Sequence, residues 1–324
     1  MLGDIFSIIV LLILTFLPFL LWGYLFSYID DSKFSRKRFL AGIFGGAISV
    51  FPILYMDKFF ELFDFRYLNI FYYTFNIATI DSVFELGLSL TLSIVTISIF
   101  ILFFYLKLFS KLKKVFFTHI LIFIFFIFSL SLFLYFVNLF LQNFQSITGL
   151  NETVIYFGDI IFNSIRLIIF YYIIVGFVEE TTKHFNFLGT SFLYIKSVKS
   201  GVLYAIFIAL GFSFVENILY LYGNFIKLGL TSELVQIYFL RSIFSVVVHI
   251  LCSSIVAYYF SRALLTYRKN NLNFPFIKVF FLGLFIGILL HAIFDITLTL
   301  GFSFVILIYF MFGYFYVTSI FYKE

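Results

Sequence analysis

Long apolar runs alternate with short polar segments along the whole chain. Because an α-helix rises about 1.5 Å per residue, an apolar run of about 20 residues crosses a hydrocarbon core of about 30 Å. The pattern therefore predicts an all-α fold, a polytopic transmembrane helix bundle of about nine spans. The predicted spans have approximate bounds at 5–28, 39–60, 83–108, 115–141, 158–180, 200–222, 236–261, 277–297 and 301–321.

The charge of the connecting loops changes from one loop to the next. Every odd-numbered loop is basic, whereas the even-numbered loops are acidic or nearly neutral. Since Lys and Arg favour the cytoplasmic side of a membrane, this alternation predicts an N-terminus outside and a C-terminus inside. We expect one integral membrane domain over residues 1–324, with four N-terminal spans in 1–150 and a five-span, catalytic-like core in 157–324.

Composition supports this class of protein. Hydrophobic residues make up 63% of the 324 and charged residues only 11%, whereas a soluble domain needs roughly a quarter of its residues charged. Lipid is therefore the expected solvent for most of the surface, and the cell membrane the expected location. The net charge of +5 comes from basic residues spread over short loops, which argues against a nucleic-acid partner. Cys252 is the only cysteine, which excludes an intrachain disulfide and a cysteine-based metal cluster.

Ionisable groups lie at the end of the fifth predicted span and within the sixth. Glu179 and Glu180 are four and three residues before Lys183, so the three can share a helix face, and Lys183 offsets part of the cost of the two carboxylates. In the sixth span, Glu216 lies about 16 residues into the helix, roughly 24 Å from its start, and Asn217 follows it. Taken alone, each of these groups is as typical of a lipid–water interface as of a functional site.

The seventh and eighth predicted spans each carry small or polar side chains along one face. Spacings of three or four residues align Arg241, Ser245, His249, Cys252 and Ser253 in the seventh span, and Gly283, Gly287, His291, Asp295 and Thr299 in the eighth. A lone buried histidine is most often packed and hydrogen-bonded. Here, however, four successive spans bring ionisable groups inward, at a cost of several kcal/mol each unless they pair, bind metal or line water. The set therefore predicts a functional polar site, in which imidazoles and carboxylates are ligand types for zinc-like ions.

At these residues the chain resembles the PrsW family of intramembrane proteases. The likeness covers about residues 170–300 and rests on four short motifs in order on successive spans: Glu179-Glu180-x-x-Lys183, Phe212-x-x-x-Glu216-Asn217, Arg241 ahead of His249, and His291-x-x-x-Asp295. The family is similar to a larger group of CAAX prenyl endopeptidases and bacteriocin-processing proteins. In that group the second motif ends in His, where this chain has Glu216.

The resemblance implies an intramembrane metallo-endopeptidase, a hydrolase that cuts a membrane-embedded protein substrate. It implies that Glu179 or Glu180 activates water, and that Asp295 supports the site. It also implies that Glu216, His249 and His291 bind a metal, with zinc expected, or orient the water. Lys183 and Asn217 belong to the same motifs. Whether metal is used or the glutamates act alone stays open, as do the substrate and the oligomeric state.

The predicted bounds place Glu179 near the inner face of the membrane and Glu216 in its outer half. For these carboxylates to meet, the fifth helix must tilt, begin later than residue 158, or border a water-filled cavity.

Two other functions fit the residues. A proton- or ion-coupled transporter also buries Glu, His, Arg and Asp along its path, although the chain shows no sequence repeat of the kind that many transporters carry. The second is a non-enzymatic, immunity-like membrane scaffold descended from the protease fold. The presence of the glutamates and histidines argues against it, because a scaffold does not need them.

Overall fold

The computed structural model describes the helices that carry the candidate site. The described residues are 2–29, 36–50, 155–157, 160–162, 165–270 and 273–323. The predicted spans at 83–108 and 115–141, and the latter part of the one at 39–60, lie outside the described residues.

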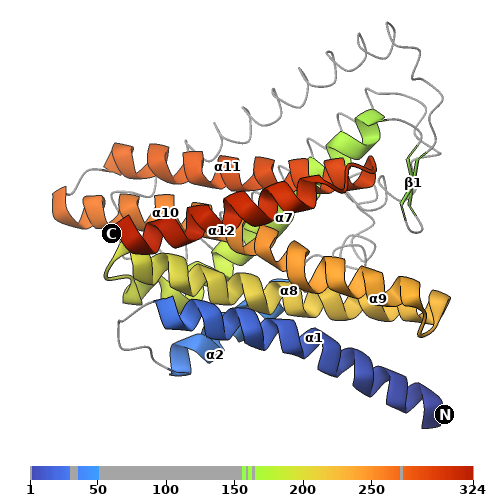
Figure 1. The fold of residues 1–324 in the computed structure, drawn as a ribbon. Helices are drawn as coiled ribbons and strands as arrows, with labels where there is room; N and C mark the ends of the chain where they lie inside the picture. The colour runs from blue at the N-terminus through green and yellow to red at the C-terminus, as the bar shows by residue number, and fades with distance from the viewer. Residues whose placement is uncertain are drawn as a thin grey trace, which may run out of the picture. The chain divides into compact units, whose positions relative to one another are not determined.

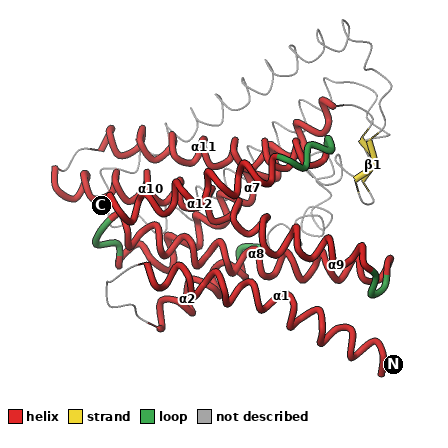
Figure 2. Tube along the Cα trace, in the orientation of Figure 1, coloured by secondary structure: helices red, strands yellow, loops and turns green. Residues whose placement is uncertain are grey.

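The described part of the chain is helical apart from one short hairpin (Figures 1 and 2). The α-helices are α1 (Leu2–Ile29), α2 (Arg36–Ile48), α7 (Ile165–Ser191), α8 (Val198–Leu228), α9 (Ser232–Phe239), α10 (Val246–Asn270), α11 (Asn273–Thr299) and α12 (Val305–Lys323). A 3-10 turn, η4 (Phe192–Tyr194), follows α7, and a π-helical segment, η5 (Leu240–Ser245), joins α9 to α10. The hairpin pairs β1 (Ile155–Phe157) with β2 (Ile160–Phe162) in antiparallel register.

The chain divides into two compact units. The first comprises Met1–Phe51, Glu179–Phe294 and Ser303–Glu324, and the second comprises Pro52–Val178 and Asp295–Phe302. Every group of the candidate site except Asp295 belongs to the first unit. In the second unit, Thr299 Oγ1 donates a hydrogen bond of 2.7 Å to the Tyr172 hydroxyl oxygen. The expected single membrane domain stays a prediction.

Four helical stretches among the described residues are long and apolar enough to cross a membrane: Val198–Leu228, Ser232–Lys269, Phe281–Thr299 and Val305–Tyr322. They coincide with the sixth to ninth predicted spans, with ends that differ by one to eight residues. The apolar part of α1, Leu12–Phe26, is shorter. Helices of this length and composition are typical of an integral membrane protein.

The helix at the place of the fifth predicted span, α7, is not one of these four stretches, and its bounds differ from the prediction at both ends. The predicted bounds are 158–180, whereas α7 runs from Ile165 to Ser191 and the predicted start falls in the hairpin. Aromatic and β-branched residues on either side of Gly158-Asp159 match a hairpin pattern as well as they match a buried helix, and hydrophobic periodicity does not separate the two over so short a run.

The later bounds of α7 change the depth of its carboxylates. Glu179 is 14 residues after Ile165 and 12 before Ser191, which places it mid-helix, about 21 Å from the start of α7. A start of the helix after residue 158 is one of the three ways in which Glu179 and Glu216 could meet.

Helix α2 packs closely against α8 through glycines on both helices. A Cβ atom added at Gly46 would overlap the carbonyl oxygen of Ile208, and one added at Gly211 would overlap that of Ile43. Glycine is therefore required at both positions for the two backbones to approach this closely. Because Gly211 directly precedes Phe212, the contact fixes the part of α8 that reaches the candidate site.

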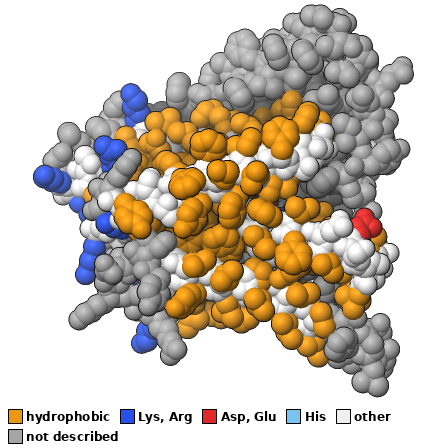
Figure 3. Space-filling model, viewed as in Figure 1, with side chains coloured by type: hydrophobic (Ala, Val, Ile, Leu, Met, Phe, Trp, Pro, Cys, Tyr) orange, Lys and Arg blue, Asp and Glu red, His pale blue; other side chains and the backbone are white. Residues whose placement is uncertain are grey.

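Basic side chains gather at one end of the first unit, called the basic end (Figure 3). They come from the start of α2, the start of α8, the end of α10 and the start of α11, and include Lys37, Arg38, Lys199, Arg268, Lys269 and Lys278. Arg268 Nη1 donates a 2.7 Å hydrogen bond to the Ile195 carbonyl oxygen, which joins the end of α10 to the segment before α8. The α8–α9 turn, with Glu233 in the first turn of α9, lies at the opposite end.

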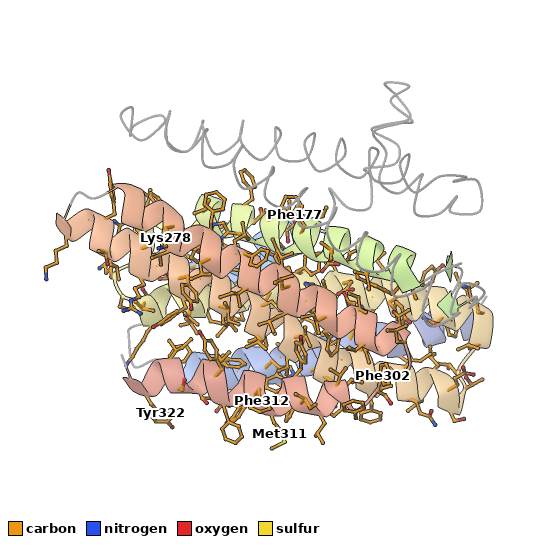
Figure 4. All side chains as sticks on the ribbon, turned by 90° about the horizontal axis from the view of Figure 1, so that it is seen from above. Phe177, Lys278, Phe302, Met311, Phe312 and Tyr322 are labelled. Atoms are coloured by element: carbon orange, nitrogen blue, oxygen red, sulfur yellow. The ribbon has the colours of Figure 1, made fainter. Side chains whose placement is uncertain are left out.

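Helix α12 turns large apolar side chains outward. Met311, Phe312 and Tyr322 point away from the helix in Figure 4 and are 50%, 72% and 89% exposed. Exposed apolar side chains in this number suit lipid as the surrounding solvent.

Candidate active site

Glu179 and Glu180 are buried in the middle of α7, 7% and 1% exposed. Lys183, one turn later, is 1% exposed. Its Nζ lies 2.5 Å from Glu180 Oε1 and 3.8 Å from Glu179 Oε2. Taking a charge out of water is costly unless an opposite charge is close. In α7, Lys183 is that opposite charge for both carboxylates, because residues three and four apart lie on the same helix face.

One arm of the site joins Glu180 to His291 of α11. His291 Nδ1 lies 2.9 Å from Glu180 Oε1, and Ser253 Oγ of α10 donates a 3.2 Å hydrogen bond to Glu180 Oε2. A carboxylate accepts the hydrogen of the imidazole nitrogen that faces it, which leaves the Nε2 lone pair of His291 directed away from Glu180.

A glycine lets α11 approach α10 at this level. Gly287 lies one turn before His291, and a Cβ atom added there would be 2.7 Å from Val256 Cγ2 of α10. Because Gly287 and His291 are four residues apart on one face of α11, this close approach also brings the histidine near α10.

A second arm joins His249 of α10 to Glu216 of α8. His249 Nε2 lies 2.9 Å from Glu216 Oε2, and Arg241 Nη2 lies 2.5 Å from Glu216 Oε1. Arg241 Nε also donates a 3.4 Å hydrogen bond to Asn217 Oδ1, and its guanidinium lies 4.3 Å from the centre of the Tyr220 ring. The outer nitrogen of His249 is therefore held by a carboxylate that is itself held by an arginine.

The π-helical segment η5 carries Arg241. A π-turn holds more residues than an α-turn and is rare, and it is often found at functional sites. Here it carries Arg241 and leads directly into α10, which carries His249, and both side chains reach Glu216.

The two arms converge on Glu179. His291 Nε2 lies 3.5 Å and His249 Nδ1 lies 3.8 Å from Glu179 Oε2. One ligand atom from each of the three buried residues lies within 4.8 Å of the others. In a tetrahedral zinc site with bonds of about 2.0–2.1 Å, ligand atoms are roughly 3.4 Å apart. The donor types therefore fit a zinc-like ion, and the ligand atoms must draw closer together than the 4.8 Å limit to bind it.

Formal charge also favours a cation at this place. The cluster holds three carboxylates, Glu179, Glu180 and Glu216, and two basic side chains, Lys183 and Arg241. With neutral imidazoles, three negative and two positive charges leave one surplus negative charge in a buried setting. A divalent ion would compensate it.

Lys183 lies next to the place of convergence. Its Nζ is 3.0 Å from His249 Nδ1 and 4.4 Å from the centre of the Phe212 ring, and that ring packs on His249 at 5.3 Å between centroids. Nδ1 is the nitrogen of His249 that faces Glu179. The ammonium group must therefore move aside for an ion to bind that nitrogen.

The structure brings together seven of the eight residues that the sequence predicts for the site. Asp295 follows His291 by one turn of α11 and belongs to the second unit, so its supporting role stays a prediction. Glu216 faces the outer nitrogen of His249, and its part as a metal ligand also stays a prediction.

Sequence analysis missed the roles of two neighbours. It aligned Arg241 and Ser253 with His249 on one helix face but gave neither a partner, although they contact Glu216 and Glu180. Helical spacing was the available signal for the shared face. The identity of the facing carboxylate depends on how α10 packs against α7 and α8, which spacing within one helix does not contain.

The fold and the site together define a class of protein: a helical, polytopic membrane protein with a buried centre of glutamates and histidines. Comparison with known families narrows this class. The PrsW family intramembrane metalloprotease model matches residues 117–320, well over half of the chain. The chain belongs to the PrsW family.

Curated relatives match a shorter part of the chain. A protease PrsW from Clostridioides difficile is 26% identical over 44% of this chain and 57% of its own length. A protease PrsW from Oceanobacillus iheyensis is 33% identical over 40% of this chain and 54% of its own length. The chain thus matches little more than half the length of these relatives. No solved structure matches the chain.

Proposed function

We propose that this chain is an intramembrane metalloprotease, which hydrolyses a peptide bond of a membrane-embedded protein substrate. The observation that carries the proposal is the convergence of two imidazole nitrogens on Glu179 Oε2, at 3.5 and 3.8 Å. In each arm a carboxylate holds the opposite ring nitrogen, Glu180 for His291 and Glu216 for His249. This carboxylate–histidine arrangement is how proteins fix the tautomer and direction of metal-binding imidazoles.

The residues take the following roles in this proposal. Glu179, His249 and His291 hold a zinc ion, which when bound supplies a Lewis acid for the scissile carbonyl group and for water. Glu216, with Arg241 behind it, orients His249. Asn217 supports Arg241 and Asp295 supports the site after His291.

Glu180 is assigned to proton transfer. It takes a proton from the attacking water while the water oxygen bonds to the carbonyl carbon, and it gives the proton to the amine nitrogen as the C–N bond breaks. The second hydrogen of the water leaves with the new carboxyl group. Lys183, at 2.5 Å, stabilises the charged form of Glu180 that begins this cycle.

The membrane arrangement is part of the proposal. We place the chain in the cell membrane with about nine spans, the N-terminus outside and the C-terminus inside. The gathering of Lys and Arg at the basic end supports a cytoplasmic position for that end. The bilayer and a membrane-embedded substrate are the expected partners.

Metal content and cleavage of a helical reporter peptide by the purified protein in detergent test the proposal. The wild type is expected to carry about one zinc per chain and to cut the reporter. A His249→Ala/His291→Ala double variant is expected to lose both. Ser254→Ala removes an equally buried hydroxyl from α10 outside the cluster and should change neither.

Two glutamine variants separate the ligand assignments. Glu179→Gln should abolish zinc binding, whereas Glu216→Gln should weaken it by roughly 10–100-fold, as the loss of an outer partner does. Loss of zinc in Glu216→Gln alone would make Glu216 the third ligand. A zinc-free wild type that still cleaves would leave a glutamate-only mechanism in place of the metalloprotease.

A further inference from the structure

A small pocket with a mixed polar and apolar lining lies beside the cluster of glutamates and histidines, between α7, α8 and α10. Its lining combines charged and hydroxyl groups with small and apolar side chains: Glu180, Lys183, His184, Phe187, Ala205, Ile208, Ser253, Val256 and Ala257. All belong to the first compact unit.

The pocket lies on the side of the cluster that faces the basic end. On α7 its residues run from Glu180 towards Phe187 and so towards the end of the helix. On α10, Ser253 and Ala257 follow His249 in the same direction, and on α8, Ala205 precedes Phe212. The Glu216–Arg241 pair lies on the other side, further along α8 and earlier on the α9–α10 run.

The lining predicts what the pocket holds. Cavities lined only by apolar groups stay dry, whereas a buried water needs two to four polar partners and a volume of about one water-sized sphere. The pocket offers room for about one water molecule. It also offers polar atoms from Glu180, Lys183, His184 and Ser253.

We propose that this pocket binds a resident water molecule, in contact with Glu180, which serves as the reserve for the nucleophilic water of peptide hydrolysis. The use of the water rests on the proposed function, whereas its binding does not. Each cleavage consumes one water at a depth that lipid keeps dry. A site that keeps water next to the residue assigned to proton transfer therefore shortens the path over which it must be replaced.

Aromatic rings pack together beside the pocket, on the side of the basic end. The His184 ring packs against Phe187 and Phe260, with centroids 5.5 and 5.0 Å apart, and those two phenylalanines are 5.7 Å apart in an edge-to-face arrangement. Phe187 and Phe260 are 1% and 0% exposed. These rings therefore form an apolar cluster beside the pocket, on the side away from Glu180 along α7.

Radiolytic hydroxyl-radical footprinting of the 324-residue chain in detergent tests the water site directly. Radicals formed from bound water oxidise the side chains that touch it. Phe187 borders the pocket and Phe207 does not, although both are fully buried. We expect Phe187 to be oxidised several-fold faster than Phe207. Equal protection of the two rings would overturn the proposal.

Filling the pocket supplies the second measurement. Ala257→Leu places a larger side chain in the pocket and should reduce oxidation of Phe187 to the level of Phe207. It should also slow cleavage at least 10-fold with zinc content unchanged. Ala263→Leu, at a buried alanine of α10 outside the pocket, should leave the footprint of Phe187 unchanged. Ala205→Val fills the pocket from α8 if Ala257→Leu does not fold.

The outcomes separate the two proposals. If Phe187 is oxidised as expected and the wild type does not cleave, the water site holds and the protease assignment fails. If the wild type cleaves and the filled variants cleave as fast with Phe187 protected, the pocket is not the source of the nucleophile, and the inference is wrong.

Discussion

Lys183 is among the largest fully buried side chains of the described chain. An ammonium group in that position needs close partners, and it has four: Glu180 at 2.5 Å, His249 Nδ1 at 3.0 Å, Glu179 at 3.8 Å and the face of the Phe212 ring. Its charge and that of Glu180 are therefore tolerable only together.

Replacing Lys183 by Met should destabilise the protein by about 3–5 kcal/mol, because Glu180 is left as a buried charge without its closest cation. The double variant Glu180→Gln/Lys183→Met should recover most of that loss. Unfolding in a denaturing detergent measures both, with Lys196→Met, at an exposed lysine, as the control. If Lys183→Met alone is as stable as the wild type, the buried charge of Glu180 does not depend on Lys183.

Arg241 acts on the site through Glu216. Arg241→Gln should weaken zinc binding by roughly 10-fold or more, because Glu216 loses the partner that fixes its hold on His249. Arg241→Lys should restore only part of the zinc affinity, because lysine keeps the positive charge but lacks the fork of N–H donors of arginine. Competition with a fluorescent chelator gives the affinity without any need for activity. Arg262→Gln, on the exposed face of α10, should match the wild type.

At the scale of elements, the contact between α2 and α8 supports the site. Gly211→Ala should separate the two helices, since its methyl group would meet the Ile43 backbone, and cleavage should fall as Phe212 shifts from His249 and Lys183. Gly223→Ala on the same helix has open space around it and should stabilise the protein by about 0.5–1 kcal/mol. Thermal unfolding and reporter cleavage are measured together. Equal behaviour of the two variants would argue against a supporting role for α2.

Sequence patterns predicted the spans of α8, α11 and α12 because each is a long apolar run with few charges. They misplaced α7, because its start competes with a hairpin and its end carries polar side chains beyond Lys183. The π-segment η5 was also missed, since a single wide turn leaves the apolar run unbroken.

The candidate site was predictable as a set but not as a geometry. Repeated three- and four-residue spacing indicated which side chains share a helix face. The pairing of each histidine with its carboxylate, Glu180 for His291 and Glu216 for His249, depends on the rotation of whole helices against one another.

At the scale of the whole molecule, α1 and α2 precede the family match, which begins at residue 117. Because α2 contacts α8 backbone to backbone, a chain lacking residues 1–51 should be unstable and inactive. Co-expression of 1–51 as a separate chain should restore both properties. Removal of residues 322–324 at the exposed end of α12 is the control. Yield and detergent gel filtration report folding, and full activity of the shortened chain would show that α1 and α2 are dispensable.

The proposed orientation is testable with single cysteines, since Cys252 is buried. In intact cells, a membrane-impermeant maleimide should label Glu233→Cys, in the first turn of α9, and not Tyr322→Cys, at the basic end of α12. Permeabilisation should make Tyr322→Cys reactive. The reverse labelling pattern would show the opposite orientation, with the N-terminus inside and the C-terminus outside.

The placement of Glu179, Glu180 and Lys183 in the middle of α7 has a consequence for how the protein is made. Ser253 and His291, which contact Glu180 in the finished fold, are 73 and 111 residues further along the chain. At a synthesis rate of about 5–20 residues per second, His291 leaves the ribosome roughly 5–20 s after Glu180. During that interval only the ion pairs of Lys183 with Glu179 and Glu180, within α7 itself, offset the cost of placing these charges in the bilayer. Helix α7 is therefore expected to reach its final depth late, held at the insertion machinery until α10 and α11 arrive to complete the site.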